Sequence, residues 1–246
     1  MNENDLTLIS EFKITSAETD MEARLRPGSL VNLLVQSAIN SADNLGFGFG
    51  GIRQQNLFWV LSRLTLEIIR PLKWHEKVEV ETWPKDVEKI LYLRDFIIRD
   101  ETQNIVAKAT SGWLAIDLDT KRAKKIDGLH AGLFVYLKNK HSIPELPEKI
   151  NTVIEGDTFN YKAEYYDIDL NKHFSATRYI DRMMDTFPVE FHKNHYPKKL
   201  SVNFLKETMP GEILRFTRQR QSEETHLFEA VNVNTDAVSF RAKVEF

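Results

Sequence analysis

The second half of the chain repeats the order of the first half. The stretch RLTLEIIRPLKWHEKVEVE (63–81) aligns without a gap on KLSVNFLKETMPGEILRFT (199–217), and FKITSAETD (12–20) matches FNYKAEYYD (159–167). Each half reads as a strand, a long helix and then antiparallel strands. Two such copies can pair their sheets edge to edge and hide strand edges that one copy would expose. The repeat therefore predicts an α+β fold with one continuous sheet.

The hydrophobic pattern places the elements of each copy. Apolar residues recur at helical spacing over 29–45, with Ser29 suited to cap the start and Gly46 to end the helix. A second helix is predicted over 175–187. Alternating and β-branched segments between 56 and 119 predict strands, and DETQN (100–104) predicts a hairpin turn.

Domain limits follow from these elements. The segment 120–156 carries several lysines and two prolines and has weak periodicity, which predicts a solvated connector. We assign 1–125 to an N-terminal unit, 126–156 to the linker and 157–246 to a C-terminal unit.

Composition limits the class of function. The 246 residues carry a net charge of −3, so no basic excess indicates nucleic acid as a partner. Cysteine is absent, which excludes disulfides, thiolate metal sites and a cysteine nucleophile. The first residues lack the pattern of a signal peptide, and the longest apolar run, LFWVL, is far shorter than the roughly 20 residues of a membrane span. We expect a cytoplasmic protein without a membrane span.

Two motifs have weak functional interpretations. GFGFGG (46–51) matches a dinucleotide-binding spacing, but a helix precedes it and a strand follows, the reverse of the required order. We interpret it as a flexible apolar loop that covers a pocket. His192 and His195 have no nearby carboxylate or thiolate, so we expect surface histidines rather than a metal site. We predict neither a metal nor a cofactor.

The stretch DIDLNKHF (167–174) is the strongest candidate for chemistry. A calcium loop would need glycine where Lys172 stands and a carboxylate where Arg178 stands, so calcium is disfavoured. A polar turn that caps the next helix remains one interpretation. The other is catalytic: in an extended segment Asp169, Asn171 and His173 would share one side, next to the free N–H groups of a helix N-terminus. A base, an amide and an imidazole so placed suit hydrolysis of an activated acyl group.

These segments resemble a known family. DIDLNKHFSATRYID, NLFWVLSRLTLEIIRPLKWHEKVEVETW and LSVNFLKETMPGE are similar to the corresponding segments of bacterial fatty acyl-[acyl carrier protein] thioesterases, in the right order along nearly the whole chain. The resemblance implies a double hotdog fold, in which each sheet wraps a long helix. It also implies hydrolysis of the thioester that joins a fatty acyl chain to the phosphopantetheine arm of acyl carrier protein.

The resemblance also implies the catalytic residues. By position, Asp169, Asn171 and His173 take the family's Asp, Asn and His, and Glu207 takes its glutamate. Many plant members carry cysteine directly after that glutamate, whereas this chain has Thr208, so attack by water is expected. The stretch DMEARLR (20–26) is matched to DIDLNKH and lacks such a cluster, which predicts one active site per chain.

The remaining expectations concern ligands and partners. The N-terminal unit is expected to hold the acyl tail, with apolar candidates from helix, loop and strand: Leu34, Ala38, Phe47, Phe49, Trp59 and Leu61. A basic surface in the C-terminal unit is expected to dock the acidic carrier, with Lys193, Lys198, Lys199, Arg215, Arg218 and Arg220 as candidates. Homodimer formation through a free sheet edge stays open. The alternatives are an acyl-CoA thioesterase, a hotdog dehydratase and a non-catalytic acyl-thioester sensor.

Overall fold

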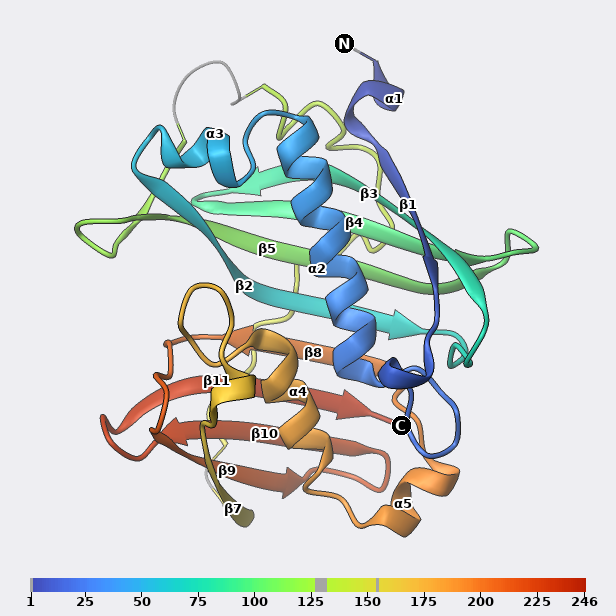
Figure 1. Cartoon of the computed structure of the whole chain (residues 1–246), viewed down its shortest axis with the longest axis vertical. Coiled ribbons are helices and arrows are strands. Elements are labelled where there is room, and N and C mark those ends of the chain that lie inside the picture. Colours follow the sequence, from blue (N-terminus) through green and yellow to red (C-terminus); the bar gives the residue numbers. More distant parts are fainter. Residues whose placement is uncertain (1, 127–131, 154) are drawn as a thin grey trace.

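The computed structural model describes residues 2–126, 132–153 and 155–246. Two halves of similar architecture lie side by side, and in each a helix runs across one face of an antiparallel sheet (Figure 1). The first half contains α1 (Glu3–Leu6), β1 (Leu8–Lys13), η1 (Ser16–Glu18), α2 (Pro27–Asn44), α3 (Phe49–Arg53), β2 (Leu57–Ile68), β3 (Lys77–Glu88), β4 (Leu91–Asp100), β5 (Ile105–Asp117) and β6 (Ala123–Lys124). The second contains β7 (Asp157–Lys162), η2 (Tyr165–Asp167), α4 (Ala176–Met184), α5 (Val189–Asn194), β8 (Lys199–Phe204), β9 (Ile213–Arg220), β10 (Thr225–Asn232) and β11 (Ala237–Glu245).

All the strands belong to one sheet. Their order is β1-β3-β4-β5-β2-β8-β11-β10-β9-β7, with β6 beside β5. The order in the second half mirrors that in the first, and the halves join where β2 pairs with β8. The predicted α+β fold with a continuous sheet is confirmed.

The junction between the halves is centred on two residues that the internal repeat matches to each other. Thr65 on β2 lies opposite Ser201 on β8, and their buried hydroxyl oxygens are 3.4 Å apart. These two residues are 136 positions apart, which is the spacing of the gapless match between 63–81 and 199–217. Thr65 and Ser201 are therefore equivalent residues of the two copies that face each other, and the antiparallel pairing is symmetric about them, with Arg63 opposite Asn203 and Glu67 opposite Lys199.

The two long helices lie on one face of the sheet (Figure 1). α2 starts at Pro27, two residues before the predicted start, because proline fits the first helical position, where its missing N–H costs nothing. Gly46 adopts φ 80° just after the helix, as expected of a residue that ends one. α4 is shorter than predicted and ends at Met184. No helix in the described part of the chain combines the length and apolar character that a membrane crossing needs.

The apolar interior forms two clusters. The larger one lies under α2 and α4 and draws side chains from both halves, among them Leu34 and Ile180. The smaller one lies in the N-terminal half and includes Phe47 and Trp83. The predicted flexible loop at 46–51 is therefore corrected: Phe47 is buried in this cluster, and α3 begins at Phe49.

The connector is not solvated as predicted. Phe134 is only 2% exposed and lies within the smaller cluster. Polar side chains of the sheet bind the connector's backbone: Ser142 N donates to Asp95 Oδ2 (2.7 Å), and Ile150 N donates to Asn203 Oδ1 (2.8 Å). The apolar residues of the connector show no periodicity, so the sequence did not predict their burial. They can be buried because polar side chains of the sheet satisfy backbone groups of the connector. Positions 127–131 and 154 of the predicted linker lie outside the described residues.

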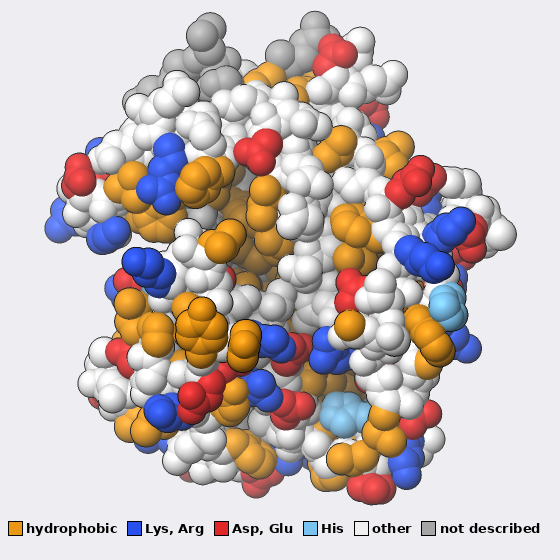
Figure 2. All heavy atoms as spheres, in the orientation of Figure 1, with side chains coloured by type: hydrophobic (Ala, Val, Ile, Leu, Met, Phe, Trp, Pro, Cys, Tyr) orange, Lys and Arg blue, Asp and Glu red, His pale blue; other side chains and the backbone are white. Residues whose placement is uncertain are grey.

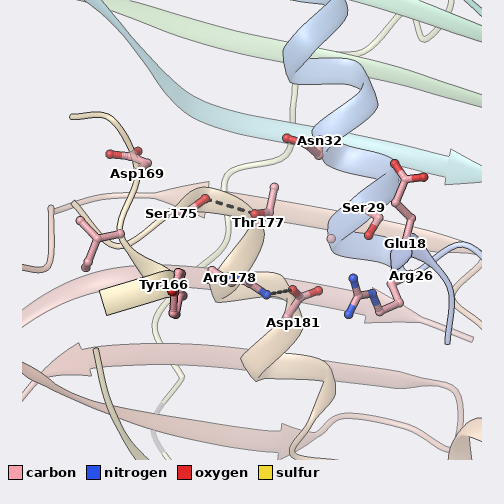
Figure 3. Close-up of a pocket in the computed structure, with 12 residues that line it drawn as sticks. Glu18, Arg26, Ser29, Asn32, Tyr166, Asp169, Ser175, Thr177, Arg178 and Asp181 are labelled. Atoms are coloured by element: carbon pink, nitrogen blue, oxygen red, sulfur yellow. Dashed lines mark hydrogen bonds and ion pairs between the residues drawn. The ribbon is translucent and has the colours of Figure 1, made fainter. Parts of the chain in front are cut away.

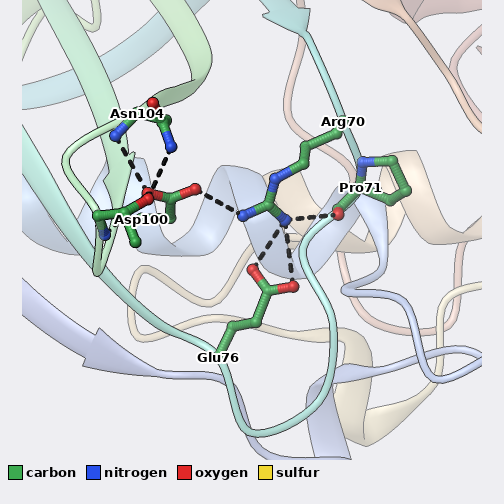
Figure 4. A network of polar contacts seen from close by, with 6 residues as sticks. Arg70, Pro71, Glu76, Asp100 and Asn104 are labelled. Atoms are coloured by element: carbon green, nitrogen blue, oxygen red, sulfur yellow. Dashed lines mark hydrogen bonds and ion pairs between the residues drawn. The ribbon is translucent and has the colours of Figure 1, made fainter.

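An ion-pair network fixes the turn between β2 and β3. The Arg70 guanidinium contacts Glu76 (2.8 Å) and Asp100 (2.9 Å), so it joins this turn to the end of β4 (Figure 4). Hydrogen bonds from Thr102 and from Arg70 hold the pKa of the Asp100 carboxyl well below its usual range. The equivalent turn in the second half carries Glu207.

Candidate active site

Residues 169–173 form a tight turn rather than the predicted extended segment. Asp169 N donates to His173 O (2.9 Å), and Lys172, with φ 67°, reverses the chain. Asp169 Oδ1 accepts the N–H groups of Asn171 (2.8 Å) and His173 (3.3 Å). Among the described residues no hydrogen bond or ion pair engages Asp169 Oδ2. One carboxylate oxygen thus holds the turn, and the other is free for a ligand.

The β8–β9 turn brings Glu207 to this loop. Phe174 N donates to Thr208 O (2.8 Å), which ties the two segments together. His173 Nε2 lies 3.4 Å from Glu207 Oε2, with the two side chains 27% and 58% exposed. A carboxylate and an imidazole that lie far apart in the sequence therefore form an accessible pair.

The Thr208 side chain points away from this pair. It is fully buried, accepts a hydrogen bond from Tyr179 Oη (2.8 Å) and lies 3.0 Å from Ser239 Oγ. Burial raises the pKa of Tyr179 to about 12, so its hydroxyl stays protonated at neutral pH. Thr208 is therefore a structural residue and not part of the acid–histidine pair.

The N-terminus of α4 follows the turn directly. Ser175 is its cap residue, but no side chain caps the first backbone N–H groups. These N–H groups have no partner within the helix and carry its positive dipole end. They lie at the end of α4 that follows the turn in the chain, so this region combines acidic groups with hydrogen-bond donors.

The first half contains the same turn with different side chains. Asp20 Oδ1 accepts the N–H groups of Glu22 and Arg24 (both 2.9 Å), and Asp20 N donates to Arg24 O (2.7 Å). Ala23 has φ 57°, matching Lys172. Asp20 is therefore the counterpart of Asp169, not of Asp167 as the sequence match had it.

This N-terminal turn is closed, in the sense that both carboxylate oxygens of its aspartate are bound within the protein. The Arg24 guanidinium pairs with Asp20 Oδ2 (2.8 Å) and also donates to His192 O. Pro71 occupies the position of Glu207, since Leu25 N donates to Leu72 O just as Phe174 N donates to Thr208 O. The prediction that the first half lacks a catalytic cluster agrees with this geometry, although the residues matched for it were two positions off.

A cavity of about 310 Å³ adjoins the C-terminal turn. It lies between the first turns of α2 and α4, and Asp169 lines one end of it (Figure 3). Its other polar side chains include Arg26, Asn32, Thr177 and Asp181, none of which stood out in the sequence. Burial raises the pKa of the Asp181 carboxyl, an effect that Arg26 and Arg178 oppose.

The six predicted acyl-contact residues lie apart from this cavity. Leu34 and Ala38 are buried in the larger cluster; Phe47 is buried in the smaller one, against which Trp59 packs. Phe49 is 65% exposed on α3. Leu61 is buried on β2. On the face of the molecule that carries α2, a hollow with hydrophobic side chains at its floor opens beside this helix (Figure 2).

The predicted basic residues do not surround the turn. Lys199 pairs with Glu67 (3.2 Å) and Arg218 with Asp157 (2.8 Å). Lys193 lies on α5, at the far side of the C-terminal half from the turn (Figure 1). Within the described residues, no group of His, Asp and Glu side chains is arranged to hold a metal ion.

Two sheet-wrapped helices joined through one sheet, with an acid–histidine pair in one half, define a double hotdog protein. The model of the acyl-ACP thioesterase N-terminal domain matches residues 5–128, and that of the C-terminal domain matches residues 151–246. The chain therefore belongs to the acyl-ACP thioesterase family.

Curated relatives and solved structures agree with this assignment. The oleoyl-acyl carrier protein thioesterase 2 of Arabidopsis thaliana is 25% identical over 86% of this chain and 62% of its own length. The palmitoyl-acyl carrier protein thioesterase of Gossypium hirsutum is 26% identical over 94% of this chain and 59% of its own. The chain thus spans less than two thirds of the length of these chloroplastic relatives.

An acyl-ACP thioesterase from Bacteroides thetaiotaomicron superposes with a TM-score of 0.92 and 28% identity over the whole of both chains. The 12:0-ACP thioesterase from Umbellularia californica gives a TM-score of 0.83 at 20% identity, over 97% of this chain and 96% of its own, and supports the fold.

Proposed function

We propose that the protein hydrolyses the thioester of fatty acyl-[acyl carrier protein] to free fatty acid and holo-carrier protein. The observation that carries this proposal is the contact of His173 with Glu207 beside the free oxygen of Asp169. Family membership supports the substrate class.

In this mechanism a water molecule binds between the Asp169 and Glu207 carboxylates. One of them takes a proton from the water as its oxygen attacks the thioester carbonyl carbon. In this proposal the two acids share this role as a pair. His173 orients Glu207 through their 3.4 Å contact and polarises the water.

The attack produces a tetrahedral intermediate with a negative oxygen. The Asn171 amide and the free N–H groups at the start of α4 stabilise that oxygen, as donors aimed at developing charge do. The intermediate collapses when the carbon–sulfur bond breaks. The proton taken from the water then passes to the leaving thiolate, so the products are a carboxylic acid and a thiol.

The two halves divide the work in this proposal. The C-terminal unit (157–246) performs the chemistry, and the N-terminal unit (1–125) receives the acyl tail. The hollow beside α2 supports that division, because hydrophobic side chains floor it (Figure 2). Leu34, Ala38, Phe47, Phe49, Trp59 and Leu61 are the proposed contacts of the tail.

The proposed partner is acyl carrier protein in the cytoplasm. Two exposed lysines, Lys172 in the turn and Lys206 beside Glu207, form no ion pair with any described residue. They are suited to the acidic carrier and to the phosphate of its arm. Homodimer formation is proposed through the outermost strands, β1 and β7, which end the sheet.

The test is a hydrolysis assay with acyl carrier protein and coenzyme A substrates of the same acyl chain. Release of free acid with a higher kcat/KM for the carrier substrate is expected. Preference for the coenzyme A substrate would favour an acyl-CoA thioesterase. Hydration of an enoyl thioester would indicate a dehydratase. Tight binding without turnover would indicate a non-catalytic sensor.

The Glu207→Gln variant tests the mechanism. We expect kcat to fall by about 10²- to 10⁴-fold, because the amide cannot accept the proton of the water. The thermal midpoint should stay unchanged, since Glu207 is more than half exposed. Full activity of this variant would rule out the mechanism.

A further inference from the structure

Of the side chains that line the polar cavity between α2 and α4, only Asp169 takes part in the proposed chemistry. Both halves line it: Arg26, Ser29 and Asn32 come from the first, and Thr177, Arg178 and Asp181 from the second. Its volume of about 310 Å³ is within the range of small-ligand sites, which begin at about 300 Å³. One end is lined by Asp169, so a ligand in the cavity would reach the turn.

The close crossing of the two helices creates this cavity. A Cβ atom on Gly28 would lie 2.9 Å from Thr177 O and would also meet Asp181 Oδ1, so only glycine permits the approach. Arg178 pairs with Asp181 (3.2 Å) beside the contact. These two charged side chains are thus bound to each other.

Uncharged hydrogen-bonding side chains, among them Ser29, Asn32 and Thr177, line the cavity beside the charged Glu18, Arg26 and Asp169. The Asn32 amide projects from α2 toward the side on which Asp169 lies (Figure 3). Neither it nor the Ser29 hydroxyl has a hydrogen-bond partner among the described residues. Asn32 is exposed and offers both a donor and an acceptor, which matches a ligand amide, whereas an alkyl chain would displace water from these groups without replacing its hydrogen bonds.

We propose that this cavity binds the pantetheine arm of the substrate, with Asn32 hydrogen-bonded to one of its amides. The arm is a flexible, uncharged chain with two amides that ends at the thioester sulfur. Seated here, it delivers the thioester to Asp169 from the side of α2, while the acyl tail continues into the N-terminal half. This assignment rests on the proposed thioesterase function and adds the residues that recognise the arm.

The test compares two substrates with the same acyl chain: the acyl-pantetheine thioester and the acyl-ethanethiol thioester, which has no amide. In Asn32→Leu we expect kcat/KM for acyl-pantetheine to fall by about tenfold, the effect of losing one hydrogen bond and leaving an amide unpaired. The ethanethiol ester should change by less than about twofold, because it makes no contact with Asn32. Ser29→Ala should show the same pattern with a smaller loss.

Asn40→Leu is the matched control. Asn40 is exposed on the same helix and bonds only to Gln36, so both substrates should be hydrolysed as by the wild type. Thermal unfolding checks that each variant folds. If Asn32→Leu leaves both substrates unchanged, or lowers both equally, the assignment is overturned. Failure of the wild type to hydrolyse any thioester would instead overturn the proposed function.

Discussion

The turns at 20–24 and 169–173 share one backbone but differ in chemistry. In both, an aspartate oxygen accepts two N–H groups and a residue with positive φ reverses the chain. In the first, Arg24 neutralises the second aspartate oxygen; in the second, that oxygen is free and His173 turns to Glu207. The scaffold is therefore common to both halves, and a few side chains distinguish the half to which we assign catalysis.

The turns that follow β2 and β8 also differ in their charged contacts. In the first half Arg70 binds Glu76 and Asp100 and is followed by Pro71. In the second half Lys206 stands in the place of Arg70, and Glu212 binds Asn232 (2.7 Å) instead. The turn that carries Glu207 is thus held by a hydrogen bond between a carboxylate and an amide, and Lys206 forms no ion pair with a described residue.

The largest expected effect comes from transferring the closed turn to the catalytic half. In Asn171→Glu with His173→Arg, a guanidinium should pair with Asp169, and kcat should fall by about 10²- to 10⁴-fold. The fold should survive, because the same pattern forms this turn at Asp20. Steady-state kinetics and thermal unfolding check both statements. The control is the reverse pair, Glu22→Asn with Arg24→His, which should keep wild-type turnover. Full activity of the Asn171→Glu, His173→Arg variant would contradict the comparison.

The next effect concerns packing that only the first half has. All members of the smaller apolar cluster come from that half and the connector, and Phe134 contacts the Phe47 ring at 4.7 Å between centroids. Phe134→Ala should lower the free energy of unfolding by about 3–5 kcal/mol, measured in urea. Val135→Ala, at an exposed neighbour, should change it by less than about 0.5 kcal/mol. Equal effects of the two variants would show that the connector does not stabilise the fold.

Substitution of the two equivalent residues at the ends of the turns should give opposite results. Arg24→Met leaves the partly buried Asp20 without its partner and should cost about 1–3 kcal/mol of stability while turnover is kept. His173→Met should abolish most of the turnover and change stability little. Chemical unfolding and kinetics on both proteins distinguish the roles. Loss of activity in Arg24→Met at full stability would contradict them.

The smallest effect is a pH dependence confined to the first half. Because the pKa of Asp100 is lowered in the fold, its interactions stabilise the protein above the ordinary pKa of about 3.9 and this stability is lost as pH falls below it. Arg70→Met should therefore lower the thermal midpoint at neutral pH, and the difference from wild type should shrink near pH 3. Lys206→Met should show no such dependence, and a constant difference for Arg70→Met would refute the interpretation.

Much of the fold was predictable from the repeat. The repeat predicted two copies with sheets paired edge to edge, as observed, but the pairing of β2 with β8 and its register are seen only in the structure. The match of 12–20 with 159–167 was wrong by two residues, because both Asp167 and Asp169 can be aligned with Asp20 in the sequence. Only the hydrogen bonds of the turn distinguish them.

The site was predictable in part. The Asp169–His173 motif and Glu207 were found through the resemblance, but the tight turn that orients them depends on Lys172 adopting positive φ, which no sequence rule requires of lysine. The cavity was missed because it depends on the crossing of two helices at Gly28. Its polar residues follow no periodic pattern.

The central claim is that only the second of two equivalent turns is catalytic. The most direct test compares Asp169→Asn with Asp20→Asn, since asparagine keeps the oxygen that accepts the turn's N–H groups in both. Hydrolysis of fatty acyl-[acyl carrier protein] should fall by at least about 100-fold in the first variant and stay near wild type in the second. Equal activities of the two variants would contradict the account.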